Sequence, residues 1–507
     1  MLLSDLPEEL ILMIGRRVTS MQSMSALMRT SHQMHRILGE AFYDLTPERM
    51  RWRALVWGCQ HGFEDLAHAM LQRGGKAIMD DLDFPLKLAA RHGYAGIVRL
   101  ILDSNATFIL ENYGAIVIAA VRGHADVVRI LLEYSAAAEV NVDPRRRCLP
   151  WTEFSMALNA ALRAGNERIA YILLADNRVR MDALSLEDAA RGGNENLLRL
   201  CLRSSPYPIG NRISSPVAAA AERGQEATLN LLLGLGFDPN MRDRLLRTPL
   251  AVAALYGKEN IVKVMLDRGD VLLNAADKYG RSPFHHAAEQ GHIAIMNLLL
   301  NTKQVNVDCA DVNGETPFFY AVAKGKREAA QFLISKGARP DAQNRGGQTS
   351  LFKAIEEPSL EMVKWLLATG QVDPESRDLK GQTPLICAVK AGGFPLSVDA
   401  SGKELKAVDA EREIISLLRH AGPLPSTGHH TRSNAALRVL KHLLSLDQVN
   451  PNAQDREGRT ALSWAAWKFQ LDIVRLLLTT RGVNVNTADN DGWTPLMWVQ
   501  GTGKPRK

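Results

Sequence analysis

The chain has 507 residues, a formal net charge of +6 and a hydrophobic content of 46%. That length is too great for one ordinary hydrophobic core, so the chain must divide into domains or stack repeated units. The charge is too small for this length to indicate nucleic-acid binding, and the apolar runs are too short to cross a membrane. Five scattered cysteines indicate neither a disulfide framework nor a zinc site, and they favour a reducing compartment, the cytoplasm and/or the nucleus.

Residues 1–45 do not follow the pattern of the rest of the chain and predict three short helices. Ser4 or Asp5 can cap the first helix, which carries an apolar stripe, and two more helices are expected near residues 21–30 and 31–38. The acidic residues of this stretch are unlike a secretory leader. Three short helices make a very small core, so such a unit usually buries its apolar surface against a partner.

This segment resembles an F-box, through Leu6-Pro7-Glu8-Glu9-Leu10 and Ile14, then Met24 and Leu27, then Arg29-Thr30-Ser31 and Leu38. F-box domains dock onto the Skp adaptor of cullin–RING ubiquitin ligases. The resemblance implies that the adaptor contacts are Leu6, Pro7, Leu10, Ile11, Ile14, Leu27 and Ile37. Gly15-Arg16-Arg17 departs from the family pattern, because glycine costs a helix about 1 kcal/mol where the family continues it. The alternative is a plain helical cap that shields the first repeat.

Residues 46–82 are interpreted as connecting helices and a degenerate first repeat, and residues 83–240 as divergent repeats. Glycines that can end a helix in the left-handed conformation mark these units: Gly62, Gly93, Gly123, Gly165, Gly193, Gly224 and Gly257. Pairs of small alanines allow neighbouring helices to approach closely. The longest spacing between these glycines leaves room for a loop at residues 142–150 that contains Arg145-Arg146-Arg147. A run of three arginines can bind an acidic partner or phosphate, but it is more often part of a solvent-exposed loop.

Residues 241–393 repeat most regularly. A hydroxyl that can cap a helix recurs at Thr248, Ser282, Thr316, Thr349 and Thr383, spaced by 34, 34, 33 and 34 residues, and again at Thr460 and Thr494. Proline often follows at the first helical position, where its missing N–H is not needed. A period of 33–34 residues headed by Thr-Pro-Leu resembles the ankyrin repeat. The implied fold is an all-α ankyrin-repeat solenoid preceded by a small three-helix F-box-like domain.

The 77 residues between Thr383 and Thr460 exceed one period. We expect one repeat with an insertion at residues 394–434, followed by C-terminal repeats at 435–507 of which the last is incomplete. The alternative is two repeats plus about ten residues. In the later repeats the helix-ending glycine is expected at Gly291, Gly325, Gly392 and Gly503, and Pro358 and Phe469 stand in its place in two others.

Signals for chemistry are weak along the whole chain. Gly501-Thr-Gly-Lys504 lacks the spacing of a phosphate-binding loop, and there is no zinc-protease motif or nucleophile elbow. His285 and His286 lie inside a repeat, where an imidazole usually bonds the backbone of the next repeat. We therefore expect no enzyme activity, no cofactor, no metal site, and no nucleic-acid or membrane partner.

The implied function is recognition of another protein. Stacked repeats present a long surface lined by their loops and first helices. The ankyrin family binds its ligands with residues around the Asp-x-x-Gly-x-Thr-Pro head. Carried over, these target-binding residues are Lys278, Tyr279, Arg281, Asn313, Glu315, Arg345, Gln348, Lys380, Gln382, Arg456 and Arg459, with Val312, Leu379, Glu457 and Trp493 beside them. The set is mainly cationic, which favours an acidic target. Together with the F-box-like segment it predicts a substrate-recognition adaptor of a ubiquitin ligase; the alternative is a scaffold without a ubiquitin role.

Overall fold

The computed structural model describes residues 48–72, 82–104, 114–140, 151–182, 184–204, 215–357, 359–392, 414–419 and 435–500. All regular secondary structure in these ranges is helical. The F-box-like segment and its seven adaptor residues lie outside the described residues, as do Pro358, the arginines at 145–147 and most of residues 394–434. None of the helices in the described ranges has the length and apolar character needed to cross a membrane.

The chain divides into two compact units, Met1–Asp238 and Pro239–Lys507. The helices of the first unit are α4 (Glu48–His61), α5 (Glu64–Gln72), α7 (Asp83–His92), α8 (Ala95–Ser104), α9 (Gly114–Arg122), α10 (Ala125–Val140), α11 (Trp151–Arg163), α12 (Glu167–Leu174), α13 (Ser185–Gly192), α14 (Glu195–Ser204), α15 (Pro216–Arg223) and α16 (Glu226–Gly234).

The second unit repeats the same alternation. Its helices are α17 (Pro249–Leu255), α18 (Glu259–Arg268), α19 (Pro283–Gln290), α20 (Ile293–Asn301), α21 (Pro317–Ala323), α22 (Arg327–Ser335), α23 (Ser350–Glu356), α24 (Leu360–Ala368), α25 (Pro384–Ala391), α27 (Ala435–Leu444), α28 (Ala461–Trp467), α29 (Leu471–Thr479) and α30 (Pro495–Val499).

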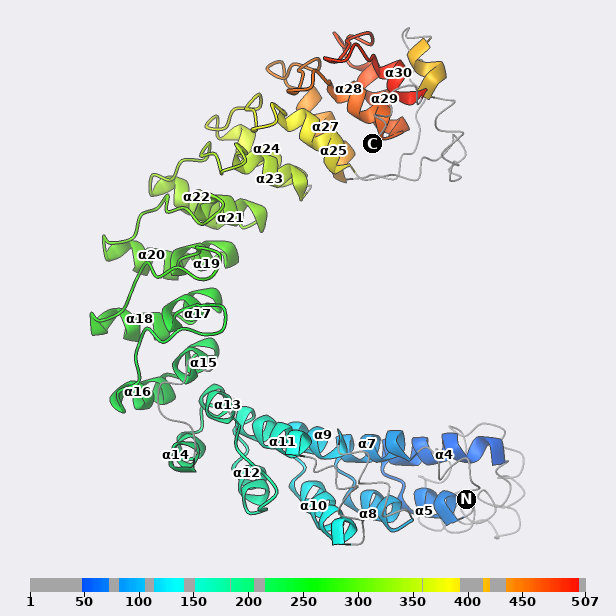
Figure 1. Cartoon of the computed structure of the whole chain (residues 1–507), viewed down its shortest axis with the longest axis vertical. Helices are drawn as coiled ribbons and strands as arrows, with labels where there is room; N and C mark the ends of the chain where they lie inside the picture. Colours follow the sequence, from blue (N-terminus) through cyan, green and yellow to red (C-terminus); the bar gives the residue numbers. More distant parts are fainter. Residues whose placement is uncertain are drawn as a thin grey trace, which may run out of the picture. The chain divides into compact units, whose positions relative to one another are not determined.

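Within the first unit, the first helices of successive repeats pack on one another in the order α4, α7, α9, α11, α13 and α15 (Figure 1). The second helices α5, α8, α10 and α12 form another layer, and α14 packs on α16. The alanine pairs Ala89-Ala90, Ala119-Ala120 and Ala189-Ala190 have no exposed surface, because each lies where two first helices meet. Residues 48–72 form the two helices of the first repeat, which pack on the next repeat through α4 and α7.

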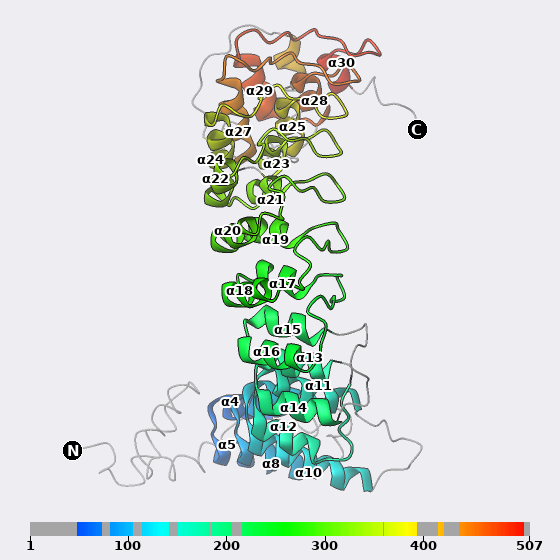
Figure 2. The ribbon, with the colours of Figure 1, turned by 90° about the vertical axis from the view of Figure 1, so that its left-hand side faces the viewer.

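The second unit has the same two layers. Helices α17, α19, α21, α23 and α25 form the layer of first helices, while α18, α20 and α22 belong to the second layer. Figure 2 shows the loops that enter each first helix projecting on one side of this layer, with the second helices on the other side. Each first helix therefore lies between a loop and a second helix. Large side chains such as Phe284, Phe318 and Phe352 are buried between repeats.

The predicted capping hydroxyls behave alike, with one exception. The side chains of Thr248, Thr316, Thr383, Thr460 and Thr494 each accept the N–H three residues on, and Ser282 forms a capping box with His285. Thr349 does not cap its helix through its hydroxyl. The N–H of Phe352 donates to the backbone carbonyl of Thr349 at 3.1 Å, so this amide is already satisfied.

Among the described residues, the left-handed turn between the two helices of a repeat occurs at each predicted glycine except Gly392. The glycines from Gly62 to Gly325 that end first helices have positive φ, and Phe469 adopts the same conformation with φ 55°. Gly392 has φ −63°. The second helix of this repeat, α27, starts only at Ala435, so the chain does not need a tight turn at Gly392 to reach it.

The repeats headed by Thr383 and Thr460 are consecutive in the stack. Helix α25 packs on α28 and on α27, and the N–H of Arg456 donates to the carbonyl of Lys380 at 2.9 Å. Equivalent bonds elsewhere join residues 32 or 33 apart, such as Lys278 to Leu245. Of the described helices, α25 and α27 pack together as the first and second helices of one repeat. The boundaries drawn from the sequence, 394–434 included, stay predictions.

Gln470, in the following repeat, hydrogen-bonds the backbone at the C-terminal end of α25. Its buried side-chain amide donates to the carbonyls of Val389, at 3.0 Å, and Gly392. We expect Gln470→Leu to lower the stability of the C-terminal repeats by about 1–3 kcal/mol, because it leaves buried carbonyls without a donor. Urea denaturation followed by circular dichroism measures this. Gln225→Leu, at the matching position of an upstream repeat, is the control, and equal effects of the two variants would contradict the assignment.

Candidate partner-binding site

The loop that enters each first helix of the second unit is a short hairpin, here called a finger, with an acidic or amide side chain at its base. The fingers comprise residues 243–248, 277–282, 311–316, 344–349, 378–383, 455–460 and 489–494. In the second finger, Asp277 Oδ1 accepts the backbone N–H groups of Tyr279, at 2.8 Å, and Arg281, at 2.9 Å. The Asp277 N–H donates to the carbonyl of Arg281, also at 2.9 Å. The side chain at the base therefore determines the shape of each finger.

Fingers of neighbouring repeats are joined by one backbone hydrogen bond each. Each bond runs from a backbone N–H to a carbonyl oxygen of the preceding finger, at 2.7–3.2 Å: Lys278 to Leu245, Val312 to Tyr279, Arg345 to Asn313, Leu379 to Gly346, Arg456 to Lys380 and Asn490 to Glu457. The residues that make these bonds occupy the first and second positions after the base. Since their backbones are paired, their side chains extend outward in a regular row.

The predicted target-binding residues fall into two groups. Those at the first or second position after the base are exposed: Lys278, Tyr279, Asn313, Arg345, Lys380 and Arg456, and also Val312, Leu379 and Glu457. Tyr279 is 47% exposed, with the ammonium group of Lys278 4.7 Å from its ring centroid. The charged members of this group are mainly cationic, and all of its side chains are open to a partner.

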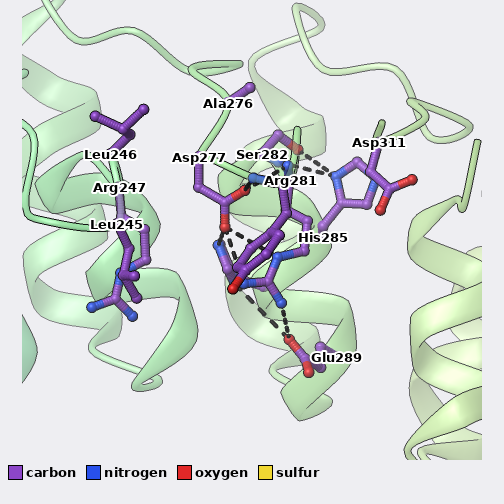
Figure 3. Close-up of polar contacts among 12 residues, drawn as sticks. Leu245, Leu246, Arg247, Ala276, Asp277, Arg281, Ser282, His285, Glu289 and Asp311 are labelled. Atoms are coloured by element: carbon purple, nitrogen blue, oxygen red, sulfur yellow. Dashed lines mark hydrogen bonds and ion pairs between the residues drawn. The ribbon is translucent and has the colours of Figure 1, made fainter. Parts of the chain in front are cut away.

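The second group occupies the fourth position after the base and makes contacts within the protein. Arg281 donates to Asp277 Oδ2 at 3.0 Å and lies 3.4 Å from Glu289 Oε2, and only 18% of its side chain is exposed (Figure 3). Arg459 pairs with Asp455 at 3.2 Å and Glu457 at 2.6 Å. These two guanidinium groups therefore stabilise their own fingers.

Three uncharged or acidic members of this second group are held in the same way. The amide of Gln348 donates to Glu356 at 3.1 Å, and Gln382 is buried and accepts from Lys390 at 3.0 Å. Burial raises the pKa of the Glu315 carboxyl. Of the two predicted groups, the exposed one is the better placed to contact a partner, and a partner-binding role for any of these residues stays a proposal.

The first helix supplies a second set of polar contacts that the sequence analysis missed. Four residues after the cap, Tyr320, Trp464 and Trp498 donate to Oδ2 of the finger aspartate of their own repeat, at 2.8–2.9 Å. His286 occupies the same position, with Nε2 3.2 Å from Asp277 Oδ2. Counting four residues on from each cap finds these positions, which face the fingers.

The paired histidines have separate structural roles. His285 Nδ1 accepts the N–H of Ser282 at 3.1 Å, and its Nε2 donates to the carbonyl of Glu315 in the next finger at 3.2 Å. Cys309 Sγ lies 3.7 Å from His285 Nδ1, a pairing that can activate a thiol. Burial, however, raises the pKa of Cys309 to about 11, so the thiolate is scarce near neutral pH. Among the described residues, no group of three or more metal-binding side chains comes together.

The repeat geometry agrees with the comparison with known families. The family model for ankyrin repeats matches residues 55–146, 186–276, 217–311, 270–344, 318–398 and 429–503, which is more than half of the chain. The chain belongs to the ankyrin-repeat family. Ankyrin repeats mediate contacts between proteins, so the row of fingers and the adjoining first helices form the candidate binding face. The matched ranges begin at residue 55, and no F-box family was found.

Three similar proteins differ widely in function. B-cell lymphoma 3 protein homolog of Mus musculus is 31% identical over 153 residues, 29% of this chain and 32% of that protein. Transient receptor potential cation channel subfamily A member 1 of Homo sapiens is 23% identical over 227 residues, 43% of this chain and 17% of that protein. E3 ubiquitin-protein ligase KEG of Arabidopsis thaliana is 32% identical over 132 residues, 26% of this chain and 8% of that protein. The chain thus covers about a third or less of each relative.

Proposed function

We propose that this ankyrin-repeat protein is a substrate-recognition adaptor of a cullin–RING ubiquitin ligase, acting in the cytoplasm or nucleus. Residues 1–45 dock the Skp-type adaptor, and the ankyrin repeats hold a target protein. The chain performs no chemistry, but it brings target lysines close to the ubiquitin-charged enzyme. The observation that carries the binding half is the row of exposed side chains on hydrogen-bonded fingers, from Lys278 to Arg456.

The ubiquitin half rests on the sequence of residues 1–45, with Leu6-Pro7-Glu8-Glu9-Leu10 at its centre. One of the similar ankyrin proteins, from Arabidopsis thaliana, is named an E3 ubiquitin-protein ligase, which supports the same pathway. The second candidate function is a scaffold without a ubiquitin role. Gly15-Arg16-Arg17 favours it, because glycine and two charges weaken the helix that has to contact the adaptor.

Co-expression with a Skp-type adaptor separates the two functions. We expect a stable one-to-one complex with the full chain, and its loss when Leu6→Asp is combined with Pro7→Ala. Leu272→Asp is the control, because Leu272 is exposed and lies outside residues 1–45. Failure to form a complex, or a complex that survives the double substitution, would falsify the adaptor role and leave the scaffold.

A further inference from the structure

Tryptophans gather at one end of the second unit, where α28 lies beside α30 (Figure 1). The ring centroids of Trp464 and Trp467 are 5.3 Å apart, those of Trp467 and Trp498 are 6.2 Å apart, and Trp493 lies 6.0 Å from Trp498. Trp464 and Trp498 are fixed by the N–H bonds to Asp455 and Asp489. Trp467 packs edge-on against both of these rings, yet it is 44% exposed. It therefore presents an aromatic surface whose orientation is already determined.

Two lysines adjoin this cluster without a carboxylate partner. The Lys390 ammonium lies 4.5 Å from the ring centroid of Trp464, and Lys468 donates to the backbone carbonyl of Lys390 at 2.6 Å. Within the described part of the chain, neither lysine forms an ion pair, since Lys390 instead donates to the amide oxygen of Gln382. Burial and neighbouring cations lower the pKa of both ammonium groups. Two half-buried positive charges thus repel each other beside an exposed indole.

The same positions in another repeat are electrically balanced. Glu289, seven residues after its cap as Lys390 is after Thr383, lies close to Arg281 and 3.9 Å from the Lys324 ammonium. Lys324 in turn occupies the repeat position of Lys468, eight residues after the cap. The uncompensated positive charge is therefore a property of the repeats around α25 and α28, and it is not a general consequence of the repeat pattern.

Charge complementarity determines what can cover this face. Carboxylates of a partner can pair with both ammonium groups, and an aromatic or large apolar side chain can pack on Trp467. The chain's own sequence after α30, Gly501-Thr-Gly-Lys-Pro-Arg-Lys507, is cationic and so is a poor match. Tryptophan is enriched at the centres of protein interfaces, and the two lysines beside the cluster add charge complementarity to an acidic partner.

We propose that Lys390, Lys468, Trp467 and Trp498 form a docking face for an acidic peptide segment of the target that carries an aromatic or large apolar side chain. This inference rests on the proposed role of the repeats in holding a target and names the chemistry of that target. It moves the centre of recognition from the finger tips to the first helices α25, α28 and α30.

Selection of a random-peptide library on the full chain tests the proposal. We expect the recovered peptides to be enriched in Asp and Glu together with Phe, Trp or Leu. Their affinity, measured by fluorescence anisotropy, should fall about tenfold or more in Trp467→Ala and in the double variant Lys390→Glu with Lys468→Glu. It should also weaken as salt is raised, because the lysine–carboxylate pairs are screened.

Two controls match these variants closely. Tyr256→Ala removes an aromatic side chain that is 46% exposed on α17's C-terminal end, and Lys324→Glu changes the lysine at the position equivalent to Lys468. Both should leave peptide affinity unchanged. The proposal is overturned if no peptides are recovered, if they lack acidic residues, or if the controls weaken binding as much as the test variants.

Two other occupants give distinct results. Tighter peptide binding after removal of residues 394–434 shows that this segment competes for the face and overturns a free docking site. A second copy of the chain is revealed by a dimer in sedimentation that Trp467→Ala dissociates, which also overturns the proposal. Binding of the Skp-type adaptor is measured on the full chain and on the same variants. If the adaptor binds the full chain while no peptides are recovered on it, the docking face is wrong and the adaptor role stands. If the adaptor does not bind while peptides do, only the adaptor role is wrong.

Discussion

Replacing Asp277 with alanine should destabilise the second unit by about 3–5 kcal/mol, because four groups depend on this buried carboxylate. Its Oδ1 atom accepts two backbone N–H groups of the finger, and its Oδ2 atom pairs with Arg281 and lies beside His286. Alanine leaves those amides without an acceptor and removes the ion pair of Arg281 with Asp277, so that its remaining carboxylate contact is the one at 3.4 Å with Glu289. Urea denaturation, with hydrogen exchange at residues 277–300, measures the loss.

Asparagine is the matched control at this position, because another repeat already uses it. Asn344 forms the base of its finger and accepts the N–H groups of Gly346 and Gln348 at 2.9 and 3.0 Å. Asp277→Asn should keep the equivalent two bonds and lose only the ion pair, at a cost of about 1–2 kcal/mol. If alanine and asparagine destabilise equally, the backbone bonds contribute little and the explanation of finger shape is wrong.

The sequence predicts the repeat because each signal is local. A capping hydroxyl, a following proline and a helix-ending glycine act within a few residues, so Ser282, Pro283 and Gly291 can be read without knowledge of the neighbouring repeat. Gly392 is the informative failure. Whether a glycine ends its helix left-handed depends on where the chain goes next, and the helix that completes this repeat begins more than forty residues later, at Ala435.

The candidate site was predicted less well for a physical reason. Exposure at the first two finger positions follows from a hairpin pattern, so the sequence predicts that Lys278 and Arg345 are exposed, as they are in the structure. Whether Arg281 faces a partner or pairs with its own Asp277 depends on its side chain folding back toward the first helix, where it also approaches Glu289. The docking face is harder still, because Lys390 and Trp464 are 74 residues apart in sequence and meet only through stacking of α25 on α28.

The stability of the second unit should fall between about pH 6.5 and pH 4 because of His286. Burial, together with the charge of Arg281, lowers its pKa from 6.5 to about 4 in the folded protein. The unfolded chain therefore binds a proton that the folded chain resists. The stability that depends on a neutral His286 is fully present above pH 6.5 and is lost as the pH falls through the folded pKa of about 4. The loss amounts to about 3 kcal/mol.

His286→Tyr isolates this effect, since Tyr320 occupies the same repeat position and donates to Asp311 at 2.8 Å. The groups facing His286 are Asp277, Arg281, Arg247, His285 and Glu289. Hydrogen bonds and the Arg281 charge outweigh burial and lower the Asp277 pKa, so that carboxylate loses its contribution only below about pH 4. Between pH 4 and 6.5 the unfolding free energy of wild type should therefore fall more steeply than that of His286→Tyr, as measured by urea denaturation at several pH values. Parallel pH profiles for the two proteins would show that His286 is charged as readily in the folded state as in the unfolded one, and that Arg281 and burial do not exclude its proton.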